Sequence, residues 1–152
     1  MVGVAPGAQV TSLQLSGPTG DIDELRLDSI AASAISYGLD HGIQFFNNSW
    51  GSDPMMPEGG TDLETVRTFF LNERPEMMAT FRRVVDQGAV LVWANGNDGF
   101  PSVALEPGLP HLFPELRANW LSVAAVGRDG PARRSAARAL YPHQHAFWRT
   151  GV

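Results

Sequence analysis

The chain of 152 residues contains no cysteine, no lysine and no apolar run long enough to span a bilayer. Without cysteine it has no disulfides and no thiolate metal sites. Residues 1–6 lack both a basic region and a long apolar core, so we do not identify them as a signal peptide. A hydrophobic fraction of 43% and a mean hydropathy of -0.10 predict one globular domain with its own core and no membrane-spanning segment.

Acidic residues are missing from the end of the chain, although the net charge is -5. All 16 acids lie at or before Asp129, whereas the residues from Pro131 onward include four arginines and no acid. This break predicts a folded domain over residues 1–130 and a basic tail over 131–152, disordered or out of frame with the domain. A basic tail could also act as a nucleic-acid arm, but we favour the interpretation without a nucleic-acid partner.

The order of the predicted elements indicates an α/β fold. We expect helices over residues 28–41 and 61–87, the second broken at Pro75, and a proline-rich loop over 100–119. The expected strands are residues 8–15, 43–48, 89–95 and 120–126. Alternation of strands and helices predicts a three-layer arrangement, a mostly parallel sheet with helices on both faces.

Four local patterns predict how the helices begin and pack. Asp28 is a suitable N-cap for the first helix, and Thr61 with Glu64 forms a possible capping box for the second. The stripe expected to face the core from the first helix is Ile30, Ala34, Tyr37 and His41. The corresponding stripe expected near the end of the second helical segment is Met78, Phe81 and Val85.

Two strand ends have a composition typical of a site. The strand over 43–48 leads into Ser49-Trp50-Gly51, and the apolar run Val90–Ala94 leads into a glycine turn that carries two asparagines. Ligands bind outside the carboxyl ends of the strands in open α/β sheets, so these turns would flank one crevice if their strands are neighbours. An amide side chain presented by such a turn is one way to build an oxyanion hole.

Four blocks in this order resemble the subtilisin-like serine proteases, or subtilases. They are Gly3–Ala8, Ile43–Gly51, Ala94–Gly99 and Trp120–Gly127, and the resemblance covers about residues 2 to 130. The helix-containing insertion between the second and third blocks, and Leu109–Glu115, are more similar to bacterial autotransporter-type members. The resemblance implies an incomplete subtilisin-like fold, a polypeptide substrate and a secreted or cell-surface location.

The resemblance also assigns roles to individual residues. It implies that the side chain of Asn97 donates a hydrogen bond to the oxyanion of the tetrahedral intermediate. It implies two walls that hold the substrate backbone by β-pairing. One wall is Ser49, Trp50 and Gly51, and the other is Ala94, Asn95 and Gly96. Gly51 and Gly96 would leave room for a substrate side chain between the walls.

The catalytic triad of the family has no counterpart in the matching blocks. Its Asp and His precede the block that begins at Gly3, where only two residues stand here, and its Gly-Thr-Ser-Met-Ala turn does not occur between Gly127 and Val152. Ser135 lacks the tight glycine turn that exposes a nucleophile. The four histidines, which are His41, His111, His143 and His145, lie in other blocks. We therefore expect an internal fragment of an endopeptidase domain that is inert alone.

We predict no cofactor and no metal, and we interpret the pair His143 and His145 as chance because no Cys, Asp or Glu is near it in the sequence. An alternative function is a non-catalytic module, a pseudoprotease that binds extended peptides through the Ser49–Gly51 edge. A nucleotide-binding domain is disfavoured, because the turn at Gly96–Gly99 is not followed by Lys and Ser or Thr.

Overall fold

The computed structural model describes residues 5–16, 26–52, 62–96 and 104–125, and all structural statements below refer to these ranges. Predicted features at residues 97–99 and 131–152 therefore lie outside the described residues, as do those at Thr61, Ser135, His143 and His145. The elements are α1 (Leu27–Asp40), β1 (Phe45–Asn48), α2 (Leu63–Glu73), α3 (Pro75–Asp86), β2 (Val90–Ala94), α4 (Leu105–Leu112), η1 (Pro114–Asn119) and β3 (Trp120–Val123).

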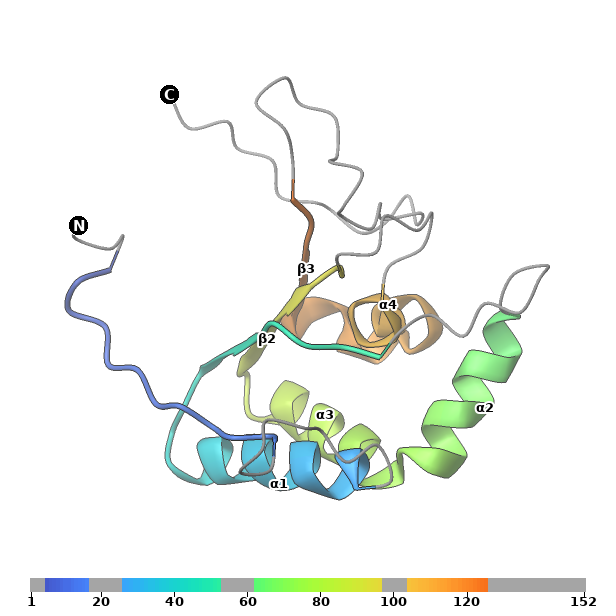
Figure 1. Cartoon of the computed structure of the whole chain (residues 1–152), viewed down its shortest axis with the longest axis horizontal. Helices are drawn as coiled ribbons and strands as arrows, with labels where there is room; N and C mark the ends of the chain where they lie inside the picture. The colour runs from blue at the N-terminus through green and yellow to red at the C-terminus, as the bar shows by residue number, and fades with distance from the viewer. Residues whose placement is uncertain (1–4, 17–25, 53–61, 97–103, 126–152) are drawn as a thin grey trace.

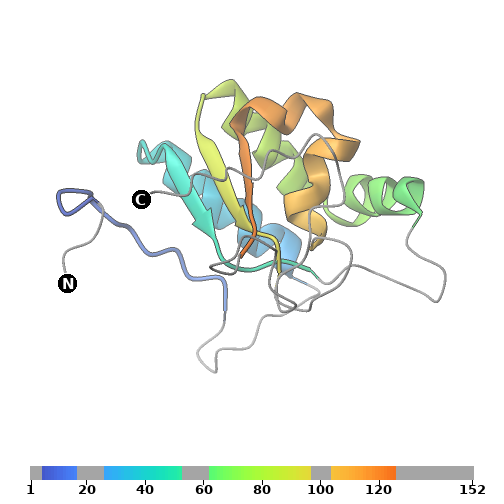
Figure 2. The same cartoon turned by 90° about the horizontal axis from the view of Figure 1, so that it is seen from above.

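The three strands form a parallel sheet in the order β1-β2-β3. Phe46 lies opposite Leu91, and Leu91 lies opposite Trp120. Because both pairs of strands are parallel, the chain has to cross over between successive strands, and it does so through helices. Figure 1 shows α1 and α3 side by side beneath the sheet, and Figure 2 shows all three strands pointing the same way. The α/β fold class predicted from the sequence is confirmed.

One face of the sheet carries the core. Phe46, Leu91, Trp93 and Trp120 point into it and are buried against the helices. The alternate residues point to the opposite face, where Phe45 is 71% exposed and Leu121 is 41% exposed. The described elements thus form a sheet and one helical layer, and the second helical layer expected from the sequence does not occur within them.

The prediction of a strand over residues 8–15 was wrong. These residues are extended but make no ladder with β1, and Val10 is 90% exposed. Leu13 and Leu15 alone rest against the core. Alternating apolar residues can lay an extended segment on a core without backbone pairing, and the sequence pattern does not separate the two cases.

The core-facing stripe of α1 also differs from the expected one. Tyr37 and His41 are exposed, and the buried positions are instead Leu27, Ala31, Ala32, Ile35, Gly38 and Leu39. Gly38 fits this buried face because a Cβ there would come within 2.5 Å of the Phe46 ring. The buried stripe is therefore rotated around the helix relative to the expected one. It faces Phe46 of β1, which comes so close to α1 that only a glycine fits at position 38.

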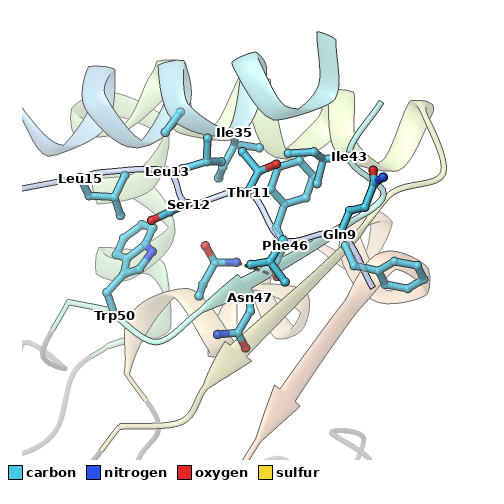
Figure 3. A pocket seen from close by; sticks show the side chains of 14 residues that line it. Gln9, Thr11, Ser12, Leu13, Leu15, Ile35, Ile43, Phe46, Asn47 and Trp50 are labelled. Atoms are coloured by element: carbon cyan, nitrogen blue, oxygen red, sulfur yellow. Dashed lines mark hydrogen bonds between the residues drawn. The ribbon is translucent and has the colours of Figure 1, made fainter. Parts of the chain in front are cut away.

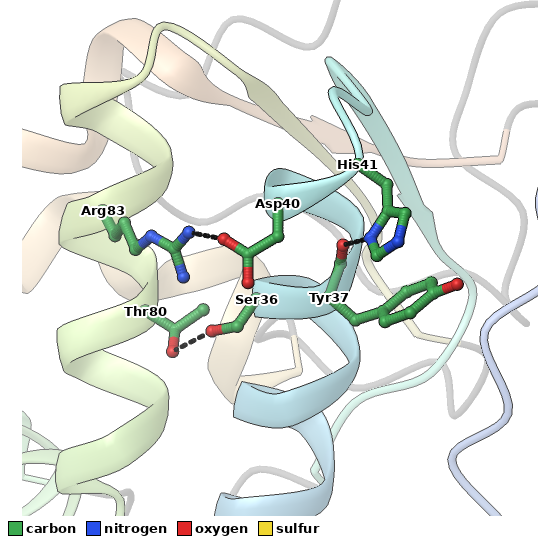
Figure 4. Close-up of polar contacts among 6 residues, drawn as sticks. All are labelled: Ser36, Tyr37, Asp40, His41, Thr80 and Arg83. Atoms are coloured by element: carbon green, nitrogen blue, oxygen red, sulfur yellow. Dashed lines mark hydrogen bonds and ion pairs between the residues drawn. The ribbon is translucent and has the colours of Figure 1, made fainter.

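Polar side-chain contacts join α1 to α3, as Figure 4 shows. Arg83 pairs with Asp40, and the hydroxyls of Ser36 and Thr80 lie 3.4 Å apart. The Nδ1 atom of His41 lies 2.8 Å from the carbonyl of Tyr37, which also accepts the backbone N–H of His41 at 3.1 Å. His41 therefore belongs to the structure that ends α1.

The break at Pro75 is confirmed, since α2 ends at Glu73 and α3 begins at Pro75. Asp62 caps α2, because its carboxylate accepts the N–H of Thr65 at 3.3 Å. The expected stripe of α3 is nearly right, with Met78 and Phe81 buried and Val84 taking the place of Val85.

Asp28 caps a different helix from the one predicted. It makes no cap bond to α1, and its carboxylate accepts the backbone N–H groups of Glu76 at 3.1 Å and Met77 at 2.8 Å. Pro75 at the first position of α3 has no N–H to satisfy. Asp28 therefore serves the next two free donors of α3 and ties the beginnings of α1 and α3 together.

Replacing Asp28 with Ala is expected to lower the free energy of unfolding by about 1–2 kcal/mol, because two helix N–H groups lose their acceptor. Urea denaturation followed by circular dichroism measures the change. Asp86→Ala is the matched control, since it removes an exposed carboxylate at the end of α3. Equal midpoints for the two variants would show that Asp28 does not cap α3.

The region over 100–119, expected as a loop, contains α4 and η1 in its described part. Pro107 lies in the first turn of α4, where a missing N–H costs no intrahelical bond. Pro110 is inside the helix, and the side-chain N–H of Arg117 donates to its carbonyl at 3.0 Å. No helix among the described residues is long and apolar enough to cross a membrane.

Candidate functional site

The two strand ends singled out in the sequence lie at the same edge of the sheet. β1 and β2 are neighbours and parallel, with Asn48 opposite Trp93. Ser49–Gly51 and Ala94–Gly96 therefore leave the sheet side by side at its carboxyl edge (Figure 2). This is the edge at which parallel α/β sheets bind ligands, and the two segments meet the geometric condition for flanking one crevice.

The predicted site residues differ in how they face solvent. Ser49, Gly51 and Ala94 are exposed, and Trp50 and Gly96 are half-buried. Ser49 and Gly51 follow the edge strand β1, whereas Ala94 belongs to the central strand and lies opposite Val123 of β3. Asn97, the predicted oxyanion donor, lies outside the described residues.

Two of these residues turn their side chains towards the interior. Trp50 packs edge-on against Trp93, with ring centroids 4.9 Å apart. Asn95 is buried, and its side-chain oxygen has no hydrogen-bond partner among the described residues. The backbone N–H of Asn95 donates to the carbonyl of Val123 at 2.9 Å and extends the pairing with β3. The carbonyl of Asn95 accepts the N–H of Ala104 at 3.0 Å, so both backbone groups of this buried residue are already bonded.

Gly96 has a φ of +101°, in the region that side chains disfavour. This glycine lies two residues after the end of β2 and precedes Asn97 in the sequence. Gly51 has a different reason to be glycine. A Cβ on it would stand 3.1 Å from the Cβ of Ala104 and 3.2 Å from a carboxylate oxygen of Glu106.

The beginning of α4 connects the two strand ends. The N–H of Ala104 donates to the carbonyl of Asn95 at 3.0 Å, and the N–H of Leu105 donates to the carbonyl of Ser52 at 3.0 Å. Both carboxylate oxygens of Glu106 accept from Ser52, one from its N–H and one from its hydroxyl, each at 2.7 Å. Three consecutive residues thus hold Asn95 and Ser52, and we call residues 104–106 the α4 latch.

Glu106 is a buried acid, with 1% of its surface exposed. Burial raises the pKa of Glu106, because desolvation opposes the charged form. The bonds from Ser52 and the positive charge of Arg74 act in the opposite direction and lower this pKa. Burial has the larger effect on the pKa of Glu106. The bonds from Ser52 therefore hold this side chain in a position where its charged form loses solvation.

A groove of about 490 Å³ runs between the extended residues 9–15 and β1, over α1, and ends at Trp50 (Figure 3). Ile35, Ile43 and Phe46 form part of its apolar lining. β1 is the edge strand of the described sheet on this side. The groove therefore separates residues 9–15 from the edge of β1.

The described histidines form no catalytic or metal arrangement. His41 bonds to a helix carbonyl, and His111 lies in the last turn of α4. No group of three or more His, Asp or Glu that could hold a metal occurs in the described part of the chain.

The α4 latch was missed by sequence reasoning. Ser52 and Glu106 are 54 residues apart, and their contact depends on how the segment after β1 meets the beginning of α4. One signal was available. Glu106 is an isolated acid in the otherwise apolar stretch over residues 103–110, and a charge in such a stretch is either exposed or specifically paired.

Comparison with known proteins gives a consistent result. The family model described as the subtilase family matches residues 1–146. Serotype-specific antigen 1 from Mannheimia haemolytica is 28% identical over 102 residues, which are 64% of this chain and 10% of that protein.

Solved structures agree in fold. The crystal structure of a lanthipeptide protease aligns with 89% of this chain at a TM-score of 0.56 and 16% identity. The Prenylagaramide maturation protease PagA aligns with 74% at a TM-score of 0.51 and 18% identity. The chain spans about a tenth of the curated relative and about a third of each of these structures, 36% and 32% respectively.

Proposed function

The chain belongs to the subtilase family, a family of serine proteases, and from this premise we propose that it forms the peptide-binding part of a subtilisin-like endopeptidase domain. An extended polypeptide would lie between Ser49–Gly51 and Ala94–Gly96 and pair with their backbones. The observation that carries the proposal is the parallel register of Asn48 opposite Trp93, which puts both segments at one sheet edge.

Two further observations support the proposed walls. Ser49, Gly51 and Ala94 are exposed, so a bound chain could reach these residues. Gly96, two residues after the end of β2, has a positive φ, and the next residue is Asn97. We propose that Asn97 is the oxyanion donor of the complete domain. An amide donor fixed at that turn would stabilise the negative oxygen of the tetrahedral intermediate without reorganising during the reaction.

The nucleophile, base and acid of the reaction are, in this proposal, contributed by residues that this chain does not contain. The absence of a Gly-Thr-Ser-like turn from its sequence supports this, as does its coverage of about a third of the matched structures. Within the family we propose an autotransporter-type member, on the resemblance of Leu109–Glu115 and of the insertion that contains α2.

The proposal predicts measurable binding of an extended peptide without peptide hydrolysis. The probe is the blocked peptide acetyl-Thr-Val-Thr-Phe-Thr-Ser-amide, whose β-branched residues favour an extended chain. Titration calorimetry should give a dissociation constant in the range of about 10 μM to 1 mM, as expected for a short strand added at an edge. A matched peptide with proline in place of the second and fifth residues lacks two pairing N–H groups and should bind at least about tenfold more weakly.

A fluorophosphonate probe tests whether this chain carries an activated serine. It labels only a serine activated by a base, and we expect no labelling of this chain. Peptide binding by a folded monomer without labelling fits both the fragment and the pseudoprotease module, so folding of the chain alone distinguishes them. Failure to fold alone favours a fragment that needs the rest of its domain. Equal affinity for both peptides would contradict binding by β-pairing, and hydrolysis by this chain would contradict the proposed absence of the triad.

A further inference from the structure

We propose that Glu106 is a positioning residue that holds the Ser49–Gly51 wall at a fixed distance from the Ala94–Gly96 wall. The inference rests on the proposed function, because the two strand ends matter in this way only if a peptide binds between them. No side chain of the α4 latch has to touch the peptide. Its contribution would be to set the spacing of the backbone groups that do.

The contact between Glu106 and Ser52 is specific in geometry. Ser52 presents two donors, its backbone N–H and its hydroxyl, and Glu106 supplies one carboxylate oxygen to each at 2.7 Å. A paired arrangement of two hydrogen bonds fixes orientation as well as distance. Ser52 follows Gly51 directly, so fixing its backbone fixes the end of the wall.

The position of Glu106 fits a carboxylate more closely than an apolar side chain. It is the second residue of α4, and its two carboxylate oxygens accept separate hydrogen bonds from Ser52. Arg74, at the junction of α2 and α3, is the charged group that acts on it in the described part of the chain. Ser52 is the partner from the segment after β1. An acid kept in a buried position at this cost indicates a demand for its particular geometry.

The link continues from Glu106 to the second wall through the backbone of α4. Leu105 donates to the carbonyl of Ser52, and Ala104 donates to the carbonyl of Asn95. Gly51 approaches the same turn so closely that a Cβ would meet both Ala104 and Glu106. The two walls are therefore connected through three residues of one helix turn, and a change at Glu106 should be felt at Asn95.

The test combines peptide affinity with hydrogen exchange on the complete chain. In Glu106→Ala the amide of Ser52 loses its acceptor, so its exchange should accelerate at least about tenfold, and that of Ala104 should accelerate in the same direction. The affinity for acetyl-Thr-Val-Thr-Phe-Thr-Ser-amide should fall about tenfold. Glu106→Gln should restore both to within about threefold, because its oxygen accepts the Ser52 N–H and its amide donates to the hydroxyl.

Two controls separate positioning from general damage. Near-ultraviolet circular dichroism of the stacked Trp93 and Trp120 reports the core and should be unchanged in each variant. Glu115→Ala removes an exposed acid of η1 that pairs with Arg82, and it should leave affinity and exchange unaltered. If Glu106→Ala loses the tryptophan signal, Ser52→Ala decides, with an expected loss of about fivefold in affinity in a folded protein.

The outcomes for Glu106 and for the proposed function are distinct. If the wild-type chain binds no peptide, the proposed function fails, and unchanged exchange at Ala104 in Glu106→Ala separately overturns the link between the walls. If the wild type binds and folded Glu106→Ala binds equally well, Glu106 is not a positioning residue, although the peptide site stands. If Glu106→Gln did not restore binding, the proposal would also be wrong. The glutamine keeps the shape of the glutamate without its charge, so binding would then depend on the charge and not on the position of the side chain.

Discussion

Replacing Trp93 with Ala is expected to destabilise the protein by about 3–5 kcal/mol, which is enough to remove cooperative folding from a marginally stable domain. Trp93 is fully buried at the centre of the aromatic cluster. Its ring lies 4.9 Å from that of Trp50, 6.0 Å from that of Phe81 and 5.4 Å from that of Trp120. Removing it opens a cavity between Trp50, which follows β1, Phe81 of α3 and Trp120 of β3.

Urea denaturation monitored by near-ultraviolet circular dichroism measures this effect. Trp93→Phe should cost much less, because the indole N–H of Trp93 has no hydrogen-bond partner among the described residues and a smaller ring keeps most of the contact. Val10→Ala, at a residue that is 90% exposed, should leave the midpoint unchanged. A wild-type midpoint for Trp93→Ala would mean that the aromatic cluster does not hold the sheet against α3.

The sequence was a reliable guide wherever a single element carries its own pattern. The run Val90–Ala94 is continuously apolar and bounded by glycines, and it forms the central strand. Pro75 breaks the second helical segment because a proline inside a helix removes a bond and clashes with the preceding turn. Met78 and Phe81 recur at helical spacing and are buried. Each of these signals depends only on residues within about one turn or one strand.

Features that depend on packing between distant elements were not predictable in the same way. Prolines 107 and 110 suggested a loop, yet α4 tolerates both, one in its first turn and one near its end. Asp28 looked like the cap of its own helix and caps α3 instead, 48 residues away. Residues 8–15 have strand composition but no partner strand in the described structure. In each case the local residues allow two structures, and a distant neighbour decides between them.

The candidate site likewise combines features with local sequence signals and features that depend on distant contacts. The positions of Ser49–Gly51 and Ala94–Gly96 follow from where two parallel strands end, and both segments were identified in the sequence. The α4 latch that connects them depends on a contact between Ser52 and Glu106, and nothing near either residue in the sequence indicates the other. The resemblance to the family identifies the two segments proposed as walls. The distance between these segments depends on their contacts with the α4 latch, which the sequence does not indicate.

Gly51→Val is expected to weaken peptide binding about thirtyfold, the largest effect on affinity among the variants considered. A Cβ at Gly51 would stand 3.1 Å from the Cβ of Ala104 and 3.2 Å from the carboxylate of Glu106. Valine adds two further carbons, and such overpacking costs about 2 kcal/mol, which corresponds to the stated loss if the wall moves to relieve it. Titration of acetyl-Thr-Val-Thr-Phe-Thr-Ser-amide into the folded variant measures the change.

Gly7→Val is the matched control, because a Cβ at Gly7 meets nothing within 4 Å and should leave the affinity unaltered. Gly51→Ala should fall between the two, since its single carbon needs neighbours to shift by only a few tenths of an ångström. A graded loss from Gly to Ala to Val, with faster exchange at the Ser52 amide, would show that affinity follows the seating of this wall against α4. If folded Gly51→Val bound the peptide with wild-type affinity, the peptide would bind at another place. Displacement of the Ser49–Gly51 wall should weaken any pairing of the peptide with it.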